Sequence, residues 1–220
     1  MIGLAIHTCS PQLGLALCPV PWEPGLPASR VNPIHQQTWD LGRDLAAHLH
    51  PMLMEFIEPH DWQDLAFLAV ARGPGGFTGT RVGVVTARTL AQQLQIPLFG
   101  VSTLAAIAQA QIEQQAITGT LAVAMAAQRG QLFTALYQPT PGGLITLQSE
   151  QIVSPPEWDH ILTQYSDPLV VLSAPASLGH TATQVLSIAY HSWQQGQRPS
   201  WDRVLPYYGQ HPVTASSPSV

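Results

Sequence analysis

The chain has 220 residues, of which 45% are apolar and only 10% are charged, and its formal net charge is −5. It carries eight arginines, scattered from Arg30 to Arg203, and no lysine. Proteins that bind nucleic acid directly usually present a basic stripe, so we do not expect this chain alone to bind RNA or DNA. Its longest apolar runs fall far short of the ~20 residues that cross a bilayer. Two cysteines and an N-terminus that reads as a strand rather than a signal peptide predict a cytoplasmic protein with reduced thiols.

The N-terminal third predicts a β-hairpin followed by a helix. Apolar runs at residues 2–8 and 13–18, joined by "CSPQ", are typical of strand, turn and strand. A proline-rich stretch at 19–33 predicts a loop, with a short strand around 29–32. Apolar side chains then recur every four residues as Leu41, Leu45, Leu49, Leu53 and Ile57. This period predicts a helix over about 36–58, kinked or split at Pro51.

The next stretch predicts a buried strand and two more helices. "LAFLAVA" at 65–71 is fully apolar, as in a strand covered on both faces. A glycine-rich turn follows, and then a helix over about 78–95. "PLFGV" predicts a short strand, and Ser102 is a natural N-cap for a helix over 102–115.

The second half repeats this order more faintly. Strands are predicted at 120–127, at 131–138, within "GLITLQSEQIV" and at 168–174, with helices from about 155 and over 178–194. Each half thus reads as three strands, a helix, a strand and a helix. That duplication predicts an α/β fold of the actin-like ATPase (ASKHA) architecture, with two RNase H-like halves of which the second is reduced. We expect an N-terminal subdomain at 1–115, a smaller one at 116–210 and a disordered tail at 211–220.

The segment "RGPGGFTGTRVG", residues 72–83, packs five glycines between the buried strand and the next helix. It lacks the Lys and Ser/Thr that complete a P-loop. Its glycine spacing is one residue too long for a dinucleotide fingerprint, and no acidic residue stands about 20 positions on. Weak anion binding at the helix N-terminus stays open as an alternative.

A structural role for these glycines is the other interpretation. Gly73, Pro74 and Gly75 predict a tight turn, followed by Phe77 and by Thr78 as the helix cap. Inside the helix, small residues recur every four positions as Gly79, Gly83, Ala87 and Ala91. Glycine in a helix interior costs ~1 kcal/mol relative to alanine, so this stripe must face a close neighbour. That neighbour is the chain's own strand beneath, another helix of this chain, or a helix of another protein.

No catalytic, cofactor or metal residues are predicted. His48 and His50 point to different faces of their helix, and no zinc motif occurs. In the actin-like ATPases the first hairpin supplies an aspartate that positions magnesium, and here His7 stands in its place. The hairpin opening the second half, "VAMAAQRG", also lacks an acid. Catalysis by this chain alone is therefore not expected.

The chain resembles the bacterial TsaB (YeaZ) family. "AVARGPGGFTGTRVGVVTARTLAQQLQIPLFGVSTLAAIA" at 69–108 is similar to the family signature almost end to end. "RGQLFTALY" at 129–137 also matches, and "VLPYYGQHPV" from residue 204 looks like the family's closing strand. Coverage is continuous through the first 140 residues and thin from about 140 to 200.

The resemblance implies a non-catalytic scaffold subunit of the complex that adds threonylcarbamoyl to the adenosine beside the anticodon of tRNA. Such a subunit pairs with TsaD through the helices near 36–58 and 78–95, and TsaD would hold the ATP and metal. Partners implied are a TsaD-like catalytic subunit, a TsaE-like ATPase and a second copy of the chain, with tRNA contacted only indirectly. The partner interface then consists of Leu45, Leu49, Gly79, Val82, Gly83, Val85 and Thr86.

The sequence also departs from the family pattern. The family usually has Asp at the position of His7, Ser at Gly76 and Asp-Ala-Arg at 126–128. These changes remove remnants of a nucleotide site and favour the loss of catalysis. An autonomous ATPase or sugar-kinase-like enzyme of the same fold is the alternative, and an M22-type metalloprotease is a remote one.

Overall fold

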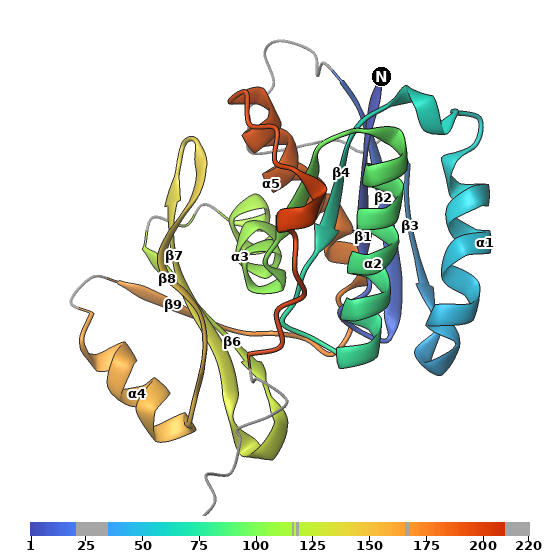
Figure 1. The fold of residues 1–220 in the computed structure, drawn as a ribbon. Helices are drawn as coiled ribbons and strands as arrows, with labels where there is room; N and C mark the ends of the chain where they lie inside the picture. The colour runs from blue at the N-terminus through green and yellow to red at the C-terminus, as the bar shows by residue number, and fades with distance from the viewer. Residues whose placement is uncertain (21–34, 116, 118, 166–167, 210–220) are drawn as a thin grey trace, which may run out of the picture.

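The computed structural model describes residues 1–20, 35–115, 117, 119–165 and 168–209. The strands form two sheets that lie between layers of helices (Figure 1). The first sheet has the order β3-β2-β1-β4-β5, and the second has the order β8-β7-β6-β9. In chain order these strands are β1 (Ile2–His7), β2 (Gln12–Pro19), β3 (His35–Asp40), β4 (Leu65–Ala71), β5 (Leu98–Val101), β6 (Thr120–Ala126), β7 (Leu132–Thr140), β8 (Gly143–Val153) and β9 (Leu169–Ser173).

The two sheets repeat one topology, as the sequence predicts. In each, three strands pair antiparallel and a later strand joins parallel to the first of them: β4 beside β1, and β9 beside β6. Within the described residues the second sheet has no counterpart of β5, so the second half is the reduced one.

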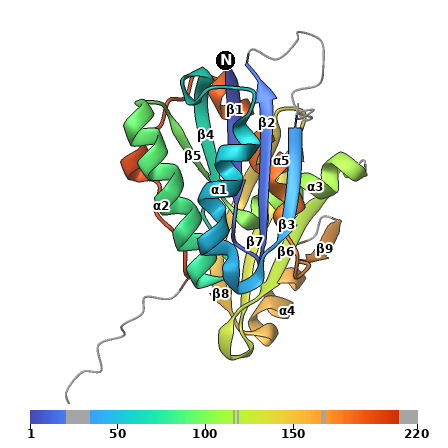
Figure 2. The same cartoon turned by 90° about the vertical axis from the view of Figure 1, so that its right-hand side faces the viewer.

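Helices cover both faces of both sheets. These are α1 (Leu45–Ile57), α2 (Phe77–Leu94), α3 (Thr103–Gln114), α4 (Pro155–Thr163) and α5 (Ala182–Gln194). Helices α1 and α2 lie side by side on one face of the first sheet, and α5 covers its other face (Figure 2). Helix α3 packs on the inner face of the second sheet and contacts α5, while α4 covers the outer face.

Helix α5 falls within the predicted 116–210 subdomain, yet it packs on β1 and β2 of the first sheet. The helical layers of the two halves therefore interleave. The strand predicted around 29–32 and the tail predicted at 211–220 lie outside the described residues.

Strand β4 shows why "LAFLAVA" is apolar at every position. Leu68 and Val70 pack into the core under α1 and α2, whereas Phe67, Ala69 and Ala71 pack against α5. A strand covered on both faces needs apolar residues on both. Among the described residues, no helix combines the length and the apolar composition needed to cross a membrane.

The predicted start of the first helix is wrong. Residues 35–40 form β3, which pairs with β2 from His35 opposite Leu17 to Asp40 opposite Gln12. Helix α1 begins only at Leu45, after Gly42 with φ +53°. This polar segment is a strand because its backbone pairs with β2, which lies 18 to 28 positions earlier in the chain. A local periodic pattern of apolar residues cannot reveal such a pairing. The split expected at Pro51 does not occur, because α1 continues through it as one helix.

Candidate functional site

The glycine-rich turn joins β4 to α2 where two other segments of the chain pass at close range. Gly73 has φ +108°, and a Cβ there would overlap the carbonyl oxygen of Tyr207. A Cβ at Gly75 would overlap the carbonyl oxygen of Cys9. The Gly73–Pro74 peptide bond is cis. Glycine is thus required at these two positions by backbone contacts within the chain, and at Gly73 also by its backbone conformation.

Helix α2 is capped two residues before the predicted cap, Thr78. Its N-cap residue is Gly76, whose amide donates to the carbonyl oxygen of Cys9 over 2.8 Å. Thr78 lies inside the first turn, so the prediction that it caps the helix is wrong. The tether to the loop after β1 fixes where the helix begins. Phe77 is 51% exposed, and its ring lies 4.6 Å from that of Tyr208.

The small-residue stripe of α2 faces the chain's own first strand and the residue that follows it. A Cβ at Gly79 would overlap the carbonyl oxygen of Thr8, and one at Gly83 would overlap the Thr8 hydroxyl. Ala87 and Ala91 are fully buried in the core beneath the helix. Glycine at these two positions lets α2 approach β1, and Gly83 is buried by that contact. A contact of half-buried Gly79 with another protein stays a prediction.

Other residues predicted for the partner interface also point inward. Leu49 is buried in the core under α1, and Leu45 is also buried, at the start of α1. Thr86 is buried, with its hydroxyl 3.5 Å from Nε2 of His50 on the neighbouring helix. Val82 is half-buried against the same core. The reason is that the four-residue period that predicts these positions marks the core side of each helix.

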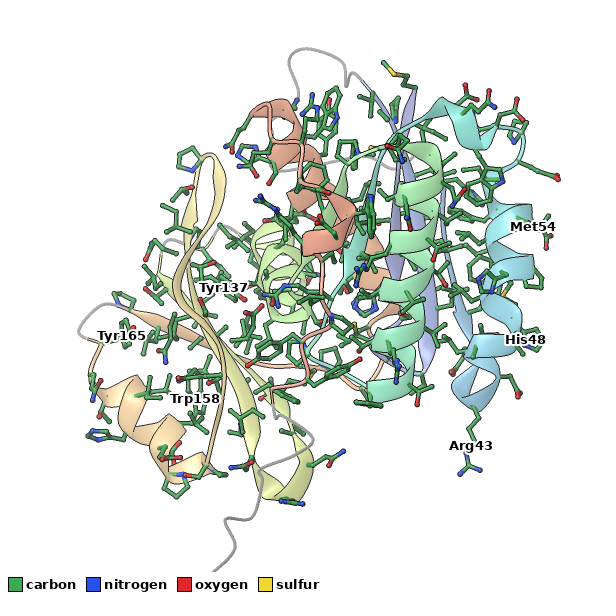
Figure 3. The ribbon with its side chains drawn as sticks, in the orientation of Figure 1. Arg43, His48, Met54, Tyr137, Trp158 and Tyr165 are labelled. Carbon is green, nitrogen blue, oxygen red and sulfur yellow. The ribbon has the colours of Figure 1, made fainter. Side chains whose placement is uncertain are left out.

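Only Val85, of the predicted interface residues, is largely exposed, at 52%. Met54 on α1 is 64% exposed, and it projects outward with His48 (Figure 3). We call the exposed residues of these two helices the α1–α2 face. It comprises Ala46, Ala47, His48, His50, Pro51, Met54 and Glu55 on α1, and Phe77, Thr78, Arg81, Val85, Thr89, Gln92 and Gln93 on α2.

A cleft of about 820 Å³ lies between the two halves. The first half contributes the loop after β1, the start of α1 and the first turn of α2. The second half contributes Met125 and Ala126 at the end of β6, and residues 174–178 after β9. Among the described residues, the lining has no carboxylate and Arg43 is its one cationic side chain, extending outward just before α1 (Figure 3). Such a lining offers none of the carboxylate oxygens that commonly anchor Mg²⁺.

His7 is not among the residues that line this cleft. It is fully buried, and neither ring nitrogen has a hydrogen-bond partner among the described residues. Burial is the main reason that the pKa of His7 falls from 6.5 to about 3, and the nearby His180 contributes to the same shift. The ring is therefore neutral at physiological pH. Within the described residues, no three His, Cys, Asp or Glu side chains gather where they could hold a metal.

The sequence does not reveal two contacts that the glycine-rich motif makes with distant segments of the chain. The ring of Phe77 pairs with Tyr208, and Arg72 forms an ion pair with Glu150 of β8. The residues of the ion pair are 78 positions apart. One available signal is that Arg72 places a charge directly after a fully buried strand, where a charge requires a partner.

Residues 41–168, more than half of the chain, match the family model described as TsaD, tRNA N6-adenosine threonylcarbamoyltransferase. The chain belongs to this family. Its curated relatives are named tRNA threonylcarbamoyladenosine biosynthesis protein TsaB. The protein of Bacillus subtilis (strain 168) is 37% identical over 116 residues, which cover 53% of this chain and 49% of the relative. The Escherichia coli (strain K12) protein is 38% identical over 97 residues, covering 44% and 42%.

These relatives assign the chain to the TsaB (YeaZ) group of the family, as the sequence motif predicts. The matches span about half the length of the curated relatives. A solved Pseudomonas aeruginosa protein with similarity to peptidase YeaZ superposes with a TM-score of 0.75 at 24% identity, over 95% of this chain and 99% of that one. The likeness shows a shared fold and confirms the predicted ASKHA-like α/β architecture.

Proposed function

We propose that this TsaB-family chain is a non-catalytic subunit in the biosynthesis of tRNA threonylcarbamoyladenosine, and that it supports a TsaD-like catalytic subunit by binding it. The names of its relatives suggest the pathway. The observation that carries the non-catalytic role is the cleft between the halves, where the part of the chain that the structure describes contributes no carboxylate to the lining. His7, at the position where the actin-like ATPases hold a magnesium-positioning acid, is buried and neutral.

The α1–α2 face is the surface that we propose for the TsaD-like partner. Val85 and Met54 leave apolar area exposed there, and apolar and methionine side chains are enriched at the centres of protein interfaces. In the absence of the partner, the same face would serve a two-fold homodimer. A TsaE-like ATPase completes the proposed assembly. ATP and metal would be bound by the partner subunits, tRNA would be reached through the catalytic subunit, and the site of action would be the cytoplasm.

Reconstitution tests the proposed role. The TsaD-like, TsaE-like and adenylate-forming proteins of the same organism are incubated with tRNA, threonine, bicarbonate and ATP, with and without this chain. Threonylcarbamoyladenosine is then measured in digested tRNA. We expect modification only when the chain is present, and unchanged modification without it would contradict the role. Calorimetry of the chain alone with Mg·ATP is the companion measurement, because binding heat would favour the autonomous ATPase.

The proposed surface has a matched control in the second half. Val85 on α2 and Ile145 on β8 are exposed to nearly the same degree, 52% and 54%. Val85→Glu should abolish co-purification with the TsaD-like subunit, because it places a charge at the centre of the apolar contact. Ile145→Glu should leave co-purification unchanged. Retention of the partner by Val85→Glu would exclude this face.

A further inference from the structure

The C-terminal segment, residues 199–209, follows the edge of the first sheet. The amide of Leu98, in edge strand β5, donates to the carbonyl oxygen of Pro199 over 3.2 Å. Val204 is buried in the core of the first sheet. Further on, the amide of Tyr207 donates to the carbonyl oxygen of Arg72 over 2.7 Å. Residues 199–209 form no strand, so the closing strand expected in "VLPYYGQHPV" does not form over its described part, 204–209, and its last four residues lie outside the described residues.

The same segment also reaches the second sheet. The hydroxyl of Tyr207 donates to the carbonyl oxygen of Glu150 over 2.8 Å, and Glu150 lies in β8, the edge strand of that sheet. The ring of Tyr207 packs edge-on against Phe133 of β7 with centroids 6.4 Å apart. Gly209 is so close to Phe133 and Ile152 that a Cβ there would overlap both. Figure 1 shows the segment passing from the first sheet toward the second.

An ion pair joins the two halves at the same place. One terminal nitrogen of Arg72, directly after β4, donates to both carboxylate oxygens of Glu150, over 2.9 and 3.0 Å. The Glu150 side chain is only 8% exposed and that of Arg72 is 29% exposed. The guanidinium group lies 5.7 Å from the ring centroid of Tyr207. A carboxylate this buried requires a cationic partner, so separating the halves here would leave an uncompensated charge.

We propose that Arg72, Glu150 and Tyr207 form a latch that fixes the angle between the two sheets. Relative motion is the default for two packed halves unless specific contacts prevent it. Here three segments meet: the end of β4, the edge strand β8 and the C-terminal segment. The latch therefore holds the cleft at one opening and holds the α1–α2 face in a fixed position relative to the second half. This inference does not depend on the proposed function. It assigns the first residue of the glycine-rich motif to inter-half positioning.

Distance measurement between two spin labels tests the latch directly. Thr89 on α2 and Asp159 on α4 are exposed and lie in different halves. Spin labels on cysteines introduced at both positions report a distance that changes with the angle between the halves. The native Cys9 and Cys18 are buried, at 2% and 0% exposure, and should not be labelled in the folded protein. Pulsed electron spin resonance then gives the distribution of distances between the labels.

We expect one narrow distribution for the parent protein and a broader, shifted one for Arg72→Ala. Arg81→Ala is the matched control, because Arg81 is an exposed arginine of the same motif within one half. If Arg72→Ala fails to fold, the double variant Arg72→Ala/Glu150→Ala decides, since it leaves no unpaired buried charge. An unchanged narrow distribution in a folded variant that lacks the ion pair would overturn the proposal. So would equal broadening in Arg81→Ala.

Discussion

Adding one methyl group at Gly79 or at Gly83 should have two different outcomes, because the two glycines face different atoms of one residue. At Gly83 the new Cβ would meet the hydroxyl of Thr8, with the Thr8 Cβ at 3.2 Å. At Gly79 it would meet the backbone carbonyl oxygen of Thr8. A side chain can be shortened by mutation, whereas a backbone carbonyl held in place directly after β1 cannot.

The expected magnitudes follow from two opposing effects. Replacing glycine by alanine in a helix interior stabilises the folded protein by about 1 kcal/mol. Forcing an extra methyl group into a well-packed contact destabilises it by about 1–3 kcal/mol. We expect Gly83→Ala to destabilise by about 1 kcal/mol and Gly79→Ala by about 2 kcal/mol, where the backbone must shift. In a Thr8→Ala background most of the overpacking penalty at Gly83 should disappear, because the hydroxyl is gone and only the Cβ at 3.2 Å remains. The penalty at Gly79 should persist, because the carbonyl oxygen is still there.

Two double-mutant cycles measure these couplings by urea unfolding of the parent protein, the three single variants and the two double variants that contain Thr8→Ala. The cycle with Gly83 should give a coupling energy of about 1 kcal/mol or more, and the cycle with Gly79 one near zero. Equal couplings, or stabilisation by Gly83→Ala in the parent protein, would refute the assignment of the stripe to the chain's own first strand. The second result is what a glycine on a solvent-exposed helix face would give.

Three further predictions follow from buried or capping groups. The pKa of His7 is lowered from 6.5 to about 3 on folding, so the unfolded chain binds the proton more readily than the folded protein. The free energy of unfolding should therefore be highest above pH 6.5 and lower by about 2 kcal/mol near pH 5. Urea unfolding at a series of pH values should show a weaker pH dependence for His7→Asn. The Ser102 hydroxyl accepts a hydrogen bond from the amide of Ala105 at the start of α3. Ser102→Ala should therefore lower the free energy of unfolding, measured with urea, by about 1 kcal/mol, and Ser102→Asp should largely keep the parent stability. Burial raises the pKa of Cys18 to about 12 and also raises that of Cys9. Neither thiol should therefore react with a disulfide reagent until the protein unfolds. Rapid reaction of either thiol in the folded protein would contradict this prediction.

Much of the fold could be predicted because its signals are local. The buried run 65–71 is a strand on composition alone, and Ser102 marks the start of α3 at the predicted residue. The duplicated order of elements predicts two sheets of like topology. The glycine-rich motif identifies the family before any contact is known, because its spacing is long and unusual.

The candidate site was only partly predictable, because burial and partners depend on distant segments. Leu45, Leu49 and Thr86 carry the same periodic pattern whether a helix packs on its own sheet or on another protein. Strand β3 forms because β2 offers a free edge, which no helical period reveals. The ion pair of Arg72 with Glu150 requires the two halves to be folded together.

By itself, the sequence determined most of the elements, their order and the small side chains along one stripe of α2. Only the tertiary structure decided what that stripe touches. Thr8 is 71 positions before Gly79 and 75 before Gly83. It contacts them because β4 pairs parallel with β1, so that α2, the helix that follows β4, starts beside the end of the first strand. A pattern of small residues specifies that a neighbour comes close, but the identity of the neighbour is a property of the packed chain.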